Sequence, residues 1–213
     1  MINPNFARKI DTLFDHALDF ENRIERHEQI DVADERETLI NAIDSAKSTI
    51  PDNKEWELSI YAFCSWVDGL IEDSQWSEKT WWYEHCLERR FFGSRDAFDL
   101  FFEKAREARE LSNKDPLEVY FLAVALGFRG IYSNPGRLQD FSRSRPLPES
   151  ITSWAKDVSR VCPKQGILKL PAQREIPRSD RPIEGRNSLR YTAMVTTLLA
   201  VVMTFLAVLL FQS

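Results

Sequence analysis

Three carboxylates near residue 70 are the first side chains in this sequence whose types and spacing could do chemistry. Asp68 and Glu72 stand four residues apart on an expected helix, and Asp73 follows directly. Residues at that spacing share one helix face, where two carboxylates could act as general acid and base, form an acidic docking surface or remain a solvated face. We predict that Asp68, Glu72 and Asp73 bind a partner, and a solvated face stays open as the alternative.

The other groups that support catalysis are too scattered to form a catalytic or metal site. His16 and His27 are eleven residues apart on one expected helix, about 16 Å, and His85 has no neighbour at ligand spacing. The cysteines at positions 64, 86 and 162 contain no C-x-x-C pair, which argues against a zinc site and a disulfide framework. No nucleophile motif is present. We therefore predict a protein that is not an enzyme and that needs no metal or cofactor.

A second cluster combines an expected helix end with a cation. It reads Gly127-Phe128-Arg129-Gly130, and Tyr132 follows two residues later. A glycine at the end of an apolar helix permits a left-handed cap, and a second glycine allows a tight exit, so that Phe128 and Tyr132 can pack back on the helices. A phosphate-binding loop is disfavoured, because the spacing fits neither G-x-G-x-x-G nor a Walker sequence. We predict a structural motif here, with Arg129 as a candidate partner contact.

The charge is distributed unevenly along the chain. The 28 Lys and Arg against 33 Asp and Glu give a formal net charge of −5. Residues 163–190 contain seven Lys or Arg, three acids and four prolines, so this stretch carries +4 and residues 1–162 carry −9. Because an acidic body disfavours contact with phosphates, we predict no nucleic-acid partner, even for the arginines between residues 137 and 145.

Helices are expected to position these groups. The sequence has 7 Gly but 14 Phe and 6 Trp, and its apolar residues recur at steps of three and four. This pattern predicts an all-α domain of about seven helices within residues 1–162. The expected helices cover residues 4–27, 32–48, 56–73, 77–92, 95–108, 117–126 and 148–161.

Local signals mark several of the helix ends. Gly93 is expected to close the 77–92 helix, and Ser94 is expected to cap the next one. Asp115-Pro116 is a start signal for the 117–126 helix, which we predict to be the most buried helix of the domain, with Phe121 in its core. Three aromatic pairs are also expected in the core or at the interface between helix bundles; they are Trp81-Trp82, Phe91-Phe92 and Phe101-Phe102.

A C-terminal segment is predicted to span a membrane. Residues 191–211 contain no charge, and a helix of this length is about 30 Å long, the thickness of a bilayer core. Arginines precede this segment and no Lys or Arg follows it, so we expect the N-terminal side to be cytoplasmic. No N-terminal signal peptide is expected. The predicted organisation is therefore a helical domain (1–162), a basic linker (163–190) and a transmembrane anchor (191–211).

The anchor carries a stripe of small residues. They recur at steps of four, three, four and three, and they are Ala193, Thr197, Ala200, Thr204 and Ala207. Helices associate in lipid through close packing of small residues, so the stripe could pack against a partner's helix or against a second copy of this chain. Chance patterning is the alternative.

Several short motifs occur in a characteristic order. They are Tyr61-Ala-Phe-Cys-Ser-Trp-Val-Asp68, Trp76, Arg90-Phe-Phe-Gly93, Phe101-Phe102, Leu117-Glu-Val-Tyr120 and Leu126-Gly-Phe-Arg-Gly-Ile-Tyr132, followed by the C-terminal apolar segment. Taken together they resemble the DotU/IcmH/TssL family, over roughly residues 10 to 211. Two positions depart from the resemblance. The family commonly has Asp-Glu where this chain has Asp68-Gly69, and commonly an acidic residue at the position of Arg129.

The resemblance implies a cytoplasmic domain of two small helix bundles in a hook, attached to the bacterial inner membrane by a single C-terminal span. It implies a structural role in the membrane complex of a type VI secretion system, or of its type IVB relative. The implied partners are a large IcmF/TssM-like membrane protein, baseplate components and membrane lipids, and a homodimer is possible. No peptidoglycan-binding domain is expected after the span. A membrane-tethered enzyme or regulator whose helical domain binds a small ligand is the competing class, and the resemblance disfavours a eukaryotic-style tail-anchored adaptor.

Overall fold

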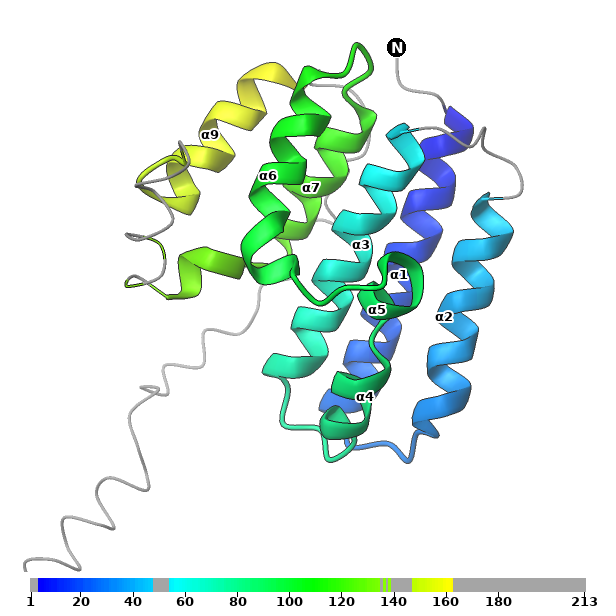
Figure 1. Ribbon diagram of the computed structural model, residues 1–213. Coiled ribbons are helices and arrows are strands. Elements are labelled where there is room, and N and C mark those ends of the chain that lie inside the picture. Colours follow the sequence, from blue (N-terminus) through cyan, green and yellow to red (C-terminus); the bar gives the residue numbers. More distant parts are fainter. Residues whose placement is uncertain (1–3, 48–53, 135, 137, 139–146, 163–213) are drawn as a thin grey trace, which may run out of the picture. The chain divides into compact units, whose positions relative to one another are not determined.

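The computed structural model of the protein describes residues 4–47, 54–134, 136, 138 and 147–162. Its elements, in chain order, are α1 (Pro4–Glu25), α2 (Val32–Lys47), α3 (Lys54–Asp73), α4 (Lys79–His85), α5 (Leu87–Phe92), α6 (Ala97–Glu110), α7 (Asp115–Ala125), the 3-10 helix η1 (Gly130–Ser133) and α9 (Ile151–Val161) (Figure 1). Helices and no strand occur in these ranges, so the all-α class is confirmed for them.

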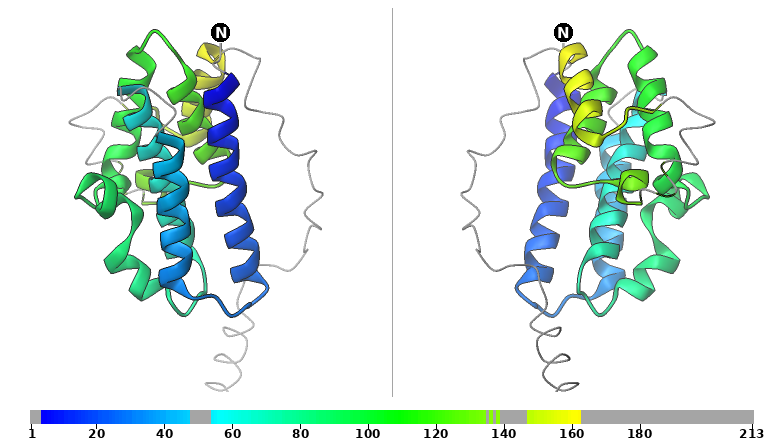
Figure 2. Two further views of the ribbon diagram at one scale, coloured as in Figure 1. Left: turned by 90° about the vertical axis from the view of Figure 1, so that its right-hand side faces the viewer. Right: turned by 90° about the vertical axis from the view of Figure 1, so that its left-hand side faces the viewer.

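Helix α3 lies in the middle of the described helices. It contacts α1, α4, α5, α6 and α7, and thirteen of its twenty residues are buried. Helices α1 and α2 pack together on one side of it, and α6, α7 and α9 lie on the other (Figures 1 and 2). Two groups of helices are thus joined through a shared central helix, while the hook-like outline stays a prediction.

Helix α1 forms because its apolar residues keep helical spacing. Its buried positions recur at steps of three and four residues and include Ile10, Leu13, Ala17 and Ile24. Burial of this stripe fixes the rotation of the helix about its axis. Its acidic residues near the C-terminal end, Glu21 and Glu25, are therefore turned away from the core.

Aromatic rings pack helices together on both sides of α3. On the side of α1, Phe14 stacks on Trp66 of α3, with ring centroids 4.8 Å apart. On the other side, Phe102 of α6 makes an edge contact with Trp154 of α9 at 5.2 Å. The predicted core pairs are confirmed in part: Trp82, Phe101 and Phe102 are buried, whereas Trp81, Phe91 and Phe92 are half-buried.

The 117–126 region forms the apolar helix that the sequence predicts. Nine of the eleven residues of α7 are buried, which is a larger share than in α3. The helix starts at Asp115, with Pro116 in its first turn, where a missing N–H is tolerated. Phe121 is only half-buried, and the neighbouring Tyr120 fills the core instead. The expectation for Phe121 is therefore wrong.

The predicted helix over residues 77–92 is wrong as a single helix. It divides into α4 and α5 at Cys86, whose ψ of 159° leaves the helical region. Gly93 closes α5 in the left-handed conformation, with φ of +70°, as predicted. Ser94 does not cap the next helix, because α6 starts at Ala97 with Asp96 at the N-cap.

The predicted C-terminal elements are not part of the described ranges. Within those ranges, no helix combines the length and the apolar character that a membrane crossing requires. The linker 163–190, the anchor 191–211 and its stripe of Ala193, Thr197, Ala200, Thr204 and Ala207 lie outside the described residues. These assignments stay predictions.

Candidate functional site

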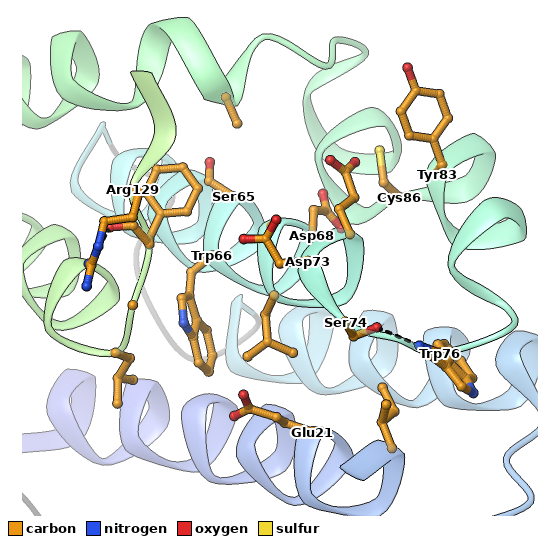
Figure 3. A pocket seen from close by; sticks show the side chains of 18 of the residues that line it. Glu21, Ser65, Trp66, Asp68, Asp73, Ser74, Trp76, Tyr83, Cys86 and Arg129 are labelled. Carbon is orange, nitrogen blue, oxygen red and sulfur yellow. Dashed lines mark hydrogen bonds between the residues drawn. The ribbon is translucent and has the colours of Figure 1, made fainter. Parts of the chain in front are cut away.

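An open groove of about 1120 Å³ collects most of the residues that the sequence singles out. Its walls come from the C-terminal half of α1, the end of α3, the α3–α4 loop, the start of α6 and the turn after α7 (Figure 3). The predicted site residues on these walls are Asp68, Glu72, Asp73, Gly127, Phe128, Arg129 and Gly130. Tyr132 is not among the lining residues. The fold thus brings two motifs that are about sixty residues apart in the sequence to one surface, which we call the acidic groove.

Carboxylates of α1 and α3 give the groove its charge. Glu21 and Glu25 of α1 and Glu28 just after it line one wall, and Asp73 at the end of α3 lines the facing one. No basic side chain of the described residues forms an ion pair with Glu21, Glu25 or Asp73. Burial and then the nearby charge of Glu25 raise the pKa of Glu21. The three glutamates are not among the residues predicted from the sequence, although the i, i+4 spacing of Glu21 and Glu25 on one helix face was a visible signal.

The inner surface of the groove is apolar. Trp66, Leu70 and Trp76 line it from α3 and the following loop, and Phe98 and Phe128 line it from the opposite side. The Trp76 ring is held by an edge contact with Phe20, with centroids 5.4 Å apart. A partner segment that enters the groove would therefore meet aromatic surface between its charged walls.

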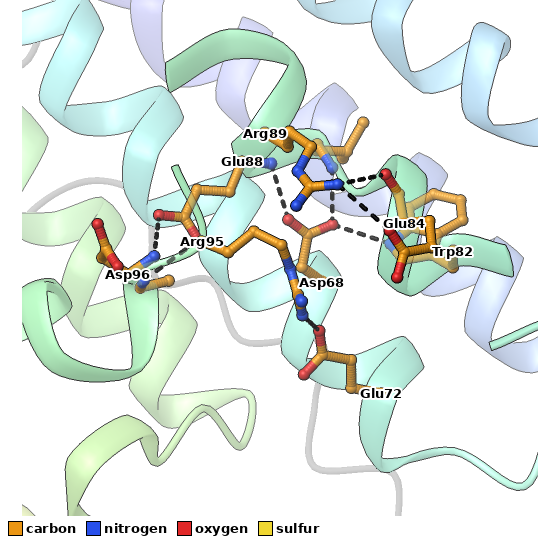
Figure 4. A network of polar contacts seen from close by, with 10 residues as sticks. Asp68, Glu72, Trp82, Glu84, Glu88, Arg89, Arg95 and Asp96 are labelled. Atoms are coloured by element: carbon orange, nitrogen blue, oxygen red, sulfur yellow. Dashed lines mark hydrogen bonds and ion pairs between the residues drawn. The ribbon is translucent and has the colours of Figure 1, made fainter. Parts of the chain in front are cut away.

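The prediction that Asp68 shares an exposed acidic helix face with Glu72 and Asp73 is wrong. The Asp68 side chain is buried, and both carboxylate oxygens accept hydrogen bonds from α4 and α5 (Figure 4). The backbone N–H of Leu87 and the indole Nε1–H of Trp82 donate to Oδ1 at 2.9 Å, and the N–H of Glu88 donates to Oδ2 at 2.8 Å. The first N–H groups of a helix have no partner inside it, so Asp68 caps α5 from another helix.

Glu88 repeats this arrangement one helix further along the chain. Its buried carboxylate accepts hydrogen bonds from the backbone N–H groups of Asp96 and Ala97, at 2.9 and 3.1 Å, where α6 begins. The hydroxyls of Ser94 and Tyr61 also donate to it, at 3.0 and 3.2 Å. Two buried carboxylates therefore hold α3, α5 and α6 in register, and the start of α6 forms one wall of the acidic groove.

The pKa of Asp68 predicts how stability depends on pH. Burial raises this pKa to about 6, against the opposing effect of its hydrogen bonds from Glu88, Leu87 and Trp82. The folded state then holds the proton more tightly than the unfolded chain, so the contribution of Asp68 to stability grows as the pH falls from 7 to 5, by about 1 kcal/mol. Urea unfolding of the parent and of Asp68→Asn at both pH values isolates this contribution. Equal pH dependence in the two proteins would contradict the raised pKa.

Glu72 and Asp73 differ in their electrostatic partners. The carboxylate of Glu72 forms an ion pair with Arg95 at 2.6 Å, and the guanidinium of Arg95 lies 3.2 Å from the centroid of the Tyr83 ring. Asp73 is exposed and points its charge at solvent. The charge of Glu72 is therefore largely compensated, whereas that of Asp73 is available to a partner.

The glycine motif ends α7 as predicted. The N–H of Phe128 donates to the carbonyl of Ala123, and the N–H of Gly127 donates to the carbonyl of Val124, which is a Schellman motif with Gly127 at φ +115°. The guanidinium of Arg129 donates to the carbonyl of Val124 at 3.1 Å but stays exposed. Arg129 thus has a structural contact, and its contact with a partner stays a prediction.

Phe128 and Tyr132 pack back on the helices, also as predicted. The ring of Phe128 lies 4.2 Å from that of Phe101, between centroids, and the ring of Tyr132 lies 4.7 Å from that of Phe102. A Cβ at Gly69 would lie 3.3 Å from the Phe128 ring, so the glycine at this position leaves the ring its space. Gly69 therefore helps to shape the groove.

Replacing Gly130 with alanine is expected to lower the free energy of unfolding by about 2–4 kcal/mol. The new Cβ would lie 2.9 Å from Cε1 of Phe128 and 3.2 Å from the carbonyl oxygen of Phe98. The left-handed backbone, with φ of +48°, adds its own strain of about 1–2 kcal/mol. Gly93→Ala is the matched control for urea unfolding, because its φ is +70° and nothing lies within 4 Å of a Cβ there. Equal losses in both variants would show that contact with Phe128 has no effect.

Comparison with known proteins identifies a family. The family model described as "Type VI secretion system protein DotU" matches residues 6–212. A similar solved structure is the crystal structure of type VI secretion SciP/TssL from enteroaggregative Escherichia coli 042, with 19% sequence identity and a TM-score of 0.47. That likeness covers 58% of this chain and 76% of the other. No curated protein matches the sequence.

Proposed function

Because the chain belongs to the DotU family of type VI secretion system proteins, we propose that it is a tail-anchored structural subunit of the membrane complex of such a system. The observation that carries this proposal is the extent of the family match. It runs through the helical domain and the apolar segment 191–211, so both parts belong to one family unit. The description of the family favours a type VI over a type IVB system.

We expect the helical domain to lie in the cytoplasm and the anchor to cross the inner membrane once. Five arginines between residues 174 and 190 lie on the N-terminal side of the apolar segment, and the positive-inside rule predicts that this side is cytoplasmic. A reporter fused to the N-terminus should therefore be protected from external protease in intact spheroplasts. The same reporter fused after Ser213 should be digested, and it is the matched control. Digestion of the N-terminal reporter would reverse the orientation.

We propose that the partners are an IcmF/TssM-like membrane protein and components of the cytoplasmic baseplate. The acidic groove supports a docking role, because it joins charged walls to an aromatic surface. The stripe of small residues in the anchor supports packing against a second span, either of a partner or of another copy of this chain. As a scaffold, the subunit would connect the two partners by binding and would perform no chemistry.

Crosslinking in native membranes followed by affinity isolation and mass spectrometry tests the proposal. The parent chain should co-isolate with a large IcmF/TssM-like protein. Reversal of Asp73 to Lys should reduce the recovery of cytoplasmic partners without changing thermal stability, because exposed charges contribute little to it. Reversal of Glu37 on α2, which is exposed outside the groove, is the control. If no large membrane protein is recovered with the parent, the scaffold role is wrong.

A further inference from the structure

The glutamates of α1 are not explained by the folding of the domain. Glu21 and Glu25 are like charges four residues apart on one helix, an arrangement that disfavours the helix. Both face the groove that Asp73 lines from α3, and no described cation forms an ion pair with any of the three. Three carboxylates on two helices thus charge one partly enclosed space.

The groove continues past Trp76 into a second hollow. This smaller hollow, of about 450 Å³, shares Glu28, Trp76 and Ser77 with the acidic groove and adds Asp31 and Glu78. Carboxylates therefore follow the surface on both sides of the Trp76 ring. Such a ring attracts Lys and Arg side chains through its face. The two adjoining hollows, of about 1120 and 450 Å³, together offer more room than a small ligand needs, which favours a peptide segment as the occupant.

The opposite end of the groove carries a positive charge. Figure 3 shows Arg129 at one end of the groove and Trp76 at the other, with Trp66 and Asp73 between them. Phe98 and Phe128 contribute apolar surface beside Arg129. The two ends of the groove thus carry opposite charges, with the excess of negative charge on the side of α1 and Trp76.

We propose that the acidic groove binds a cationic amphipathic segment of a partner protein, with its Lys or Arg residues against Glu21, Glu25, Asp73 and Trp76. The apolar face of the segment packs on the Leu70 and Phe98 surface, and an acidic group at its other end meets Arg129. The proposal rests on the function proposed above. It adds the chemistry of the partner and the glutamates of α1 that select it.

Binding of a peptide probe to the full-length chain in lipid nanodiscs tests the charge preference. The probe is an 18-residue amphipathic peptide with lysines at every fourth position and leucines on the opposite face, and its glutamate analogue is the comparison. Fluorescence anisotropy should show binding of the lysine peptide, weakened by raising NaCl from 50 to 500 mM. The variant Glu21→Gln/Glu25→Gln/Asp73→Asn should bind it at least about tenfold more weakly.

A charge-matched control distinguishes binding of the peptide in the groove from its general attraction to an acidic protein. The variant Asp15→Asn/Glu37→Gln/Asp44→Asn removes three exposed carboxylates outside the groove and should bind within about twofold of the parent. Unchanged thermal unfolding of both variants shows that the fold is retained. Equal weakening by the two variants, equal binding of the glutamate peptide, or no binding by the parent would each overturn the proposal.

Photocrosslinking in cells tests the same inference on the natural partner. A photoreactive residue at Ser77, which is exposed and lines both hollows, should capture a partner peptide with net positive charge. The same residue at Glu37 should not capture that peptide. If the membrane complex assembles but the captured segment is neutral or acidic, the groove inference fails and the proposed function stands. If no complex assembles around the parent chain, the proposed function itself fails.

Discussion

Replacing Asp68 with alanine is expected to lower the free energy of unfolding by about 3–5 kcal/mol. The change leaves three buried donors without an acceptor: the N–H groups of Leu87 and Glu88 and the indole N–H of Trp82. Each orphaned donor costs about 1–3 kcal/mol, and relief of the buried charge offsets part of that loss. Urea unfolding monitored by circular dichroism measures the difference.

Two variants show whether the loss comes from the acceptors. Asp68→Asn keeps the size of the side chain but replaces one acceptor oxygen by a donor, so it should retain only part of the stability. Asp73→Ala removes a carboxylate from the exposed end of the same helix and should change the unfolding free energy by less than about 0.5 kcal/mol. A loss below about 1 kcal/mol in Asp68→Ala would show that the three donors find other partners.

Replacing Tyr120 with alanine is expected to lower the free energy of unfolding as much as replacing Asp68 with alanine, for a different reason. The Tyr120 side chain is fully buried in α7, with its ring 4.8 Å from that of Phe101, so Tyr120→Ala should cost about 3–5 kcal/mol of unfolding free energy. The adjacent Phe121 is half-buried, and Phe121→Ala should cost about 1–2 kcal/mol. Urea unfolding of the two variants therefore distinguishes the core face of α7 from its outer face. Equal losses would show that α7 is rotated from this arrangement.

The hydroxyl of Tyr120 makes a second comparison possible. It is buried and finds no hydrogen-bond partner among the described residues. Tyr120→Phe removes this polar atom and keeps the ring, so it should leave stability unchanged or raise it. A loss above about 1 kcal/mol would mean that the hydroxyl is bonded in solution, for example to a buried water molecule.

Local signals predicted the fold correctly where the residues that determine a helix end are neighbours in the sequence. Gly93 and Gly127 end their helices because glycine adopts the left-handed conformation at low cost, and both ends follow the prediction. The break at Cys86 could not be read locally. The acceptor that satisfies the first N–H groups of α5 is Asp68, nineteen residues earlier, and periodicity contains no information about such a distant cap.

The candidate site was predictable in its location and less so in its composition. The motif residues from Asp68 to Asp73 and from Gly127 to Gly130 do meet in one groove. Spacing from Glu72 alone gives the wrong role for Asp68, because it leaves out the neighbours of Asp68 on α3. Cys64 and Ile71, at four residues before and three after, are both fully buried and share its face of α3, so an acid there had to be buried too.

The capping of α5 and α6 by distant carboxylates has a consequence for hydrogen exchange. Amides in the first turn of a helix normally exchange early, because they bond only to water. Here the amides of Leu87, Glu88, Asp96 and Ala97 are held by buried side chains of other elements. Helices α4 and α5, of seven and six residues, are too short to persist alone. These four amides should therefore exchange together and slowly, in a single opening that separates α5 from both α3 and α6.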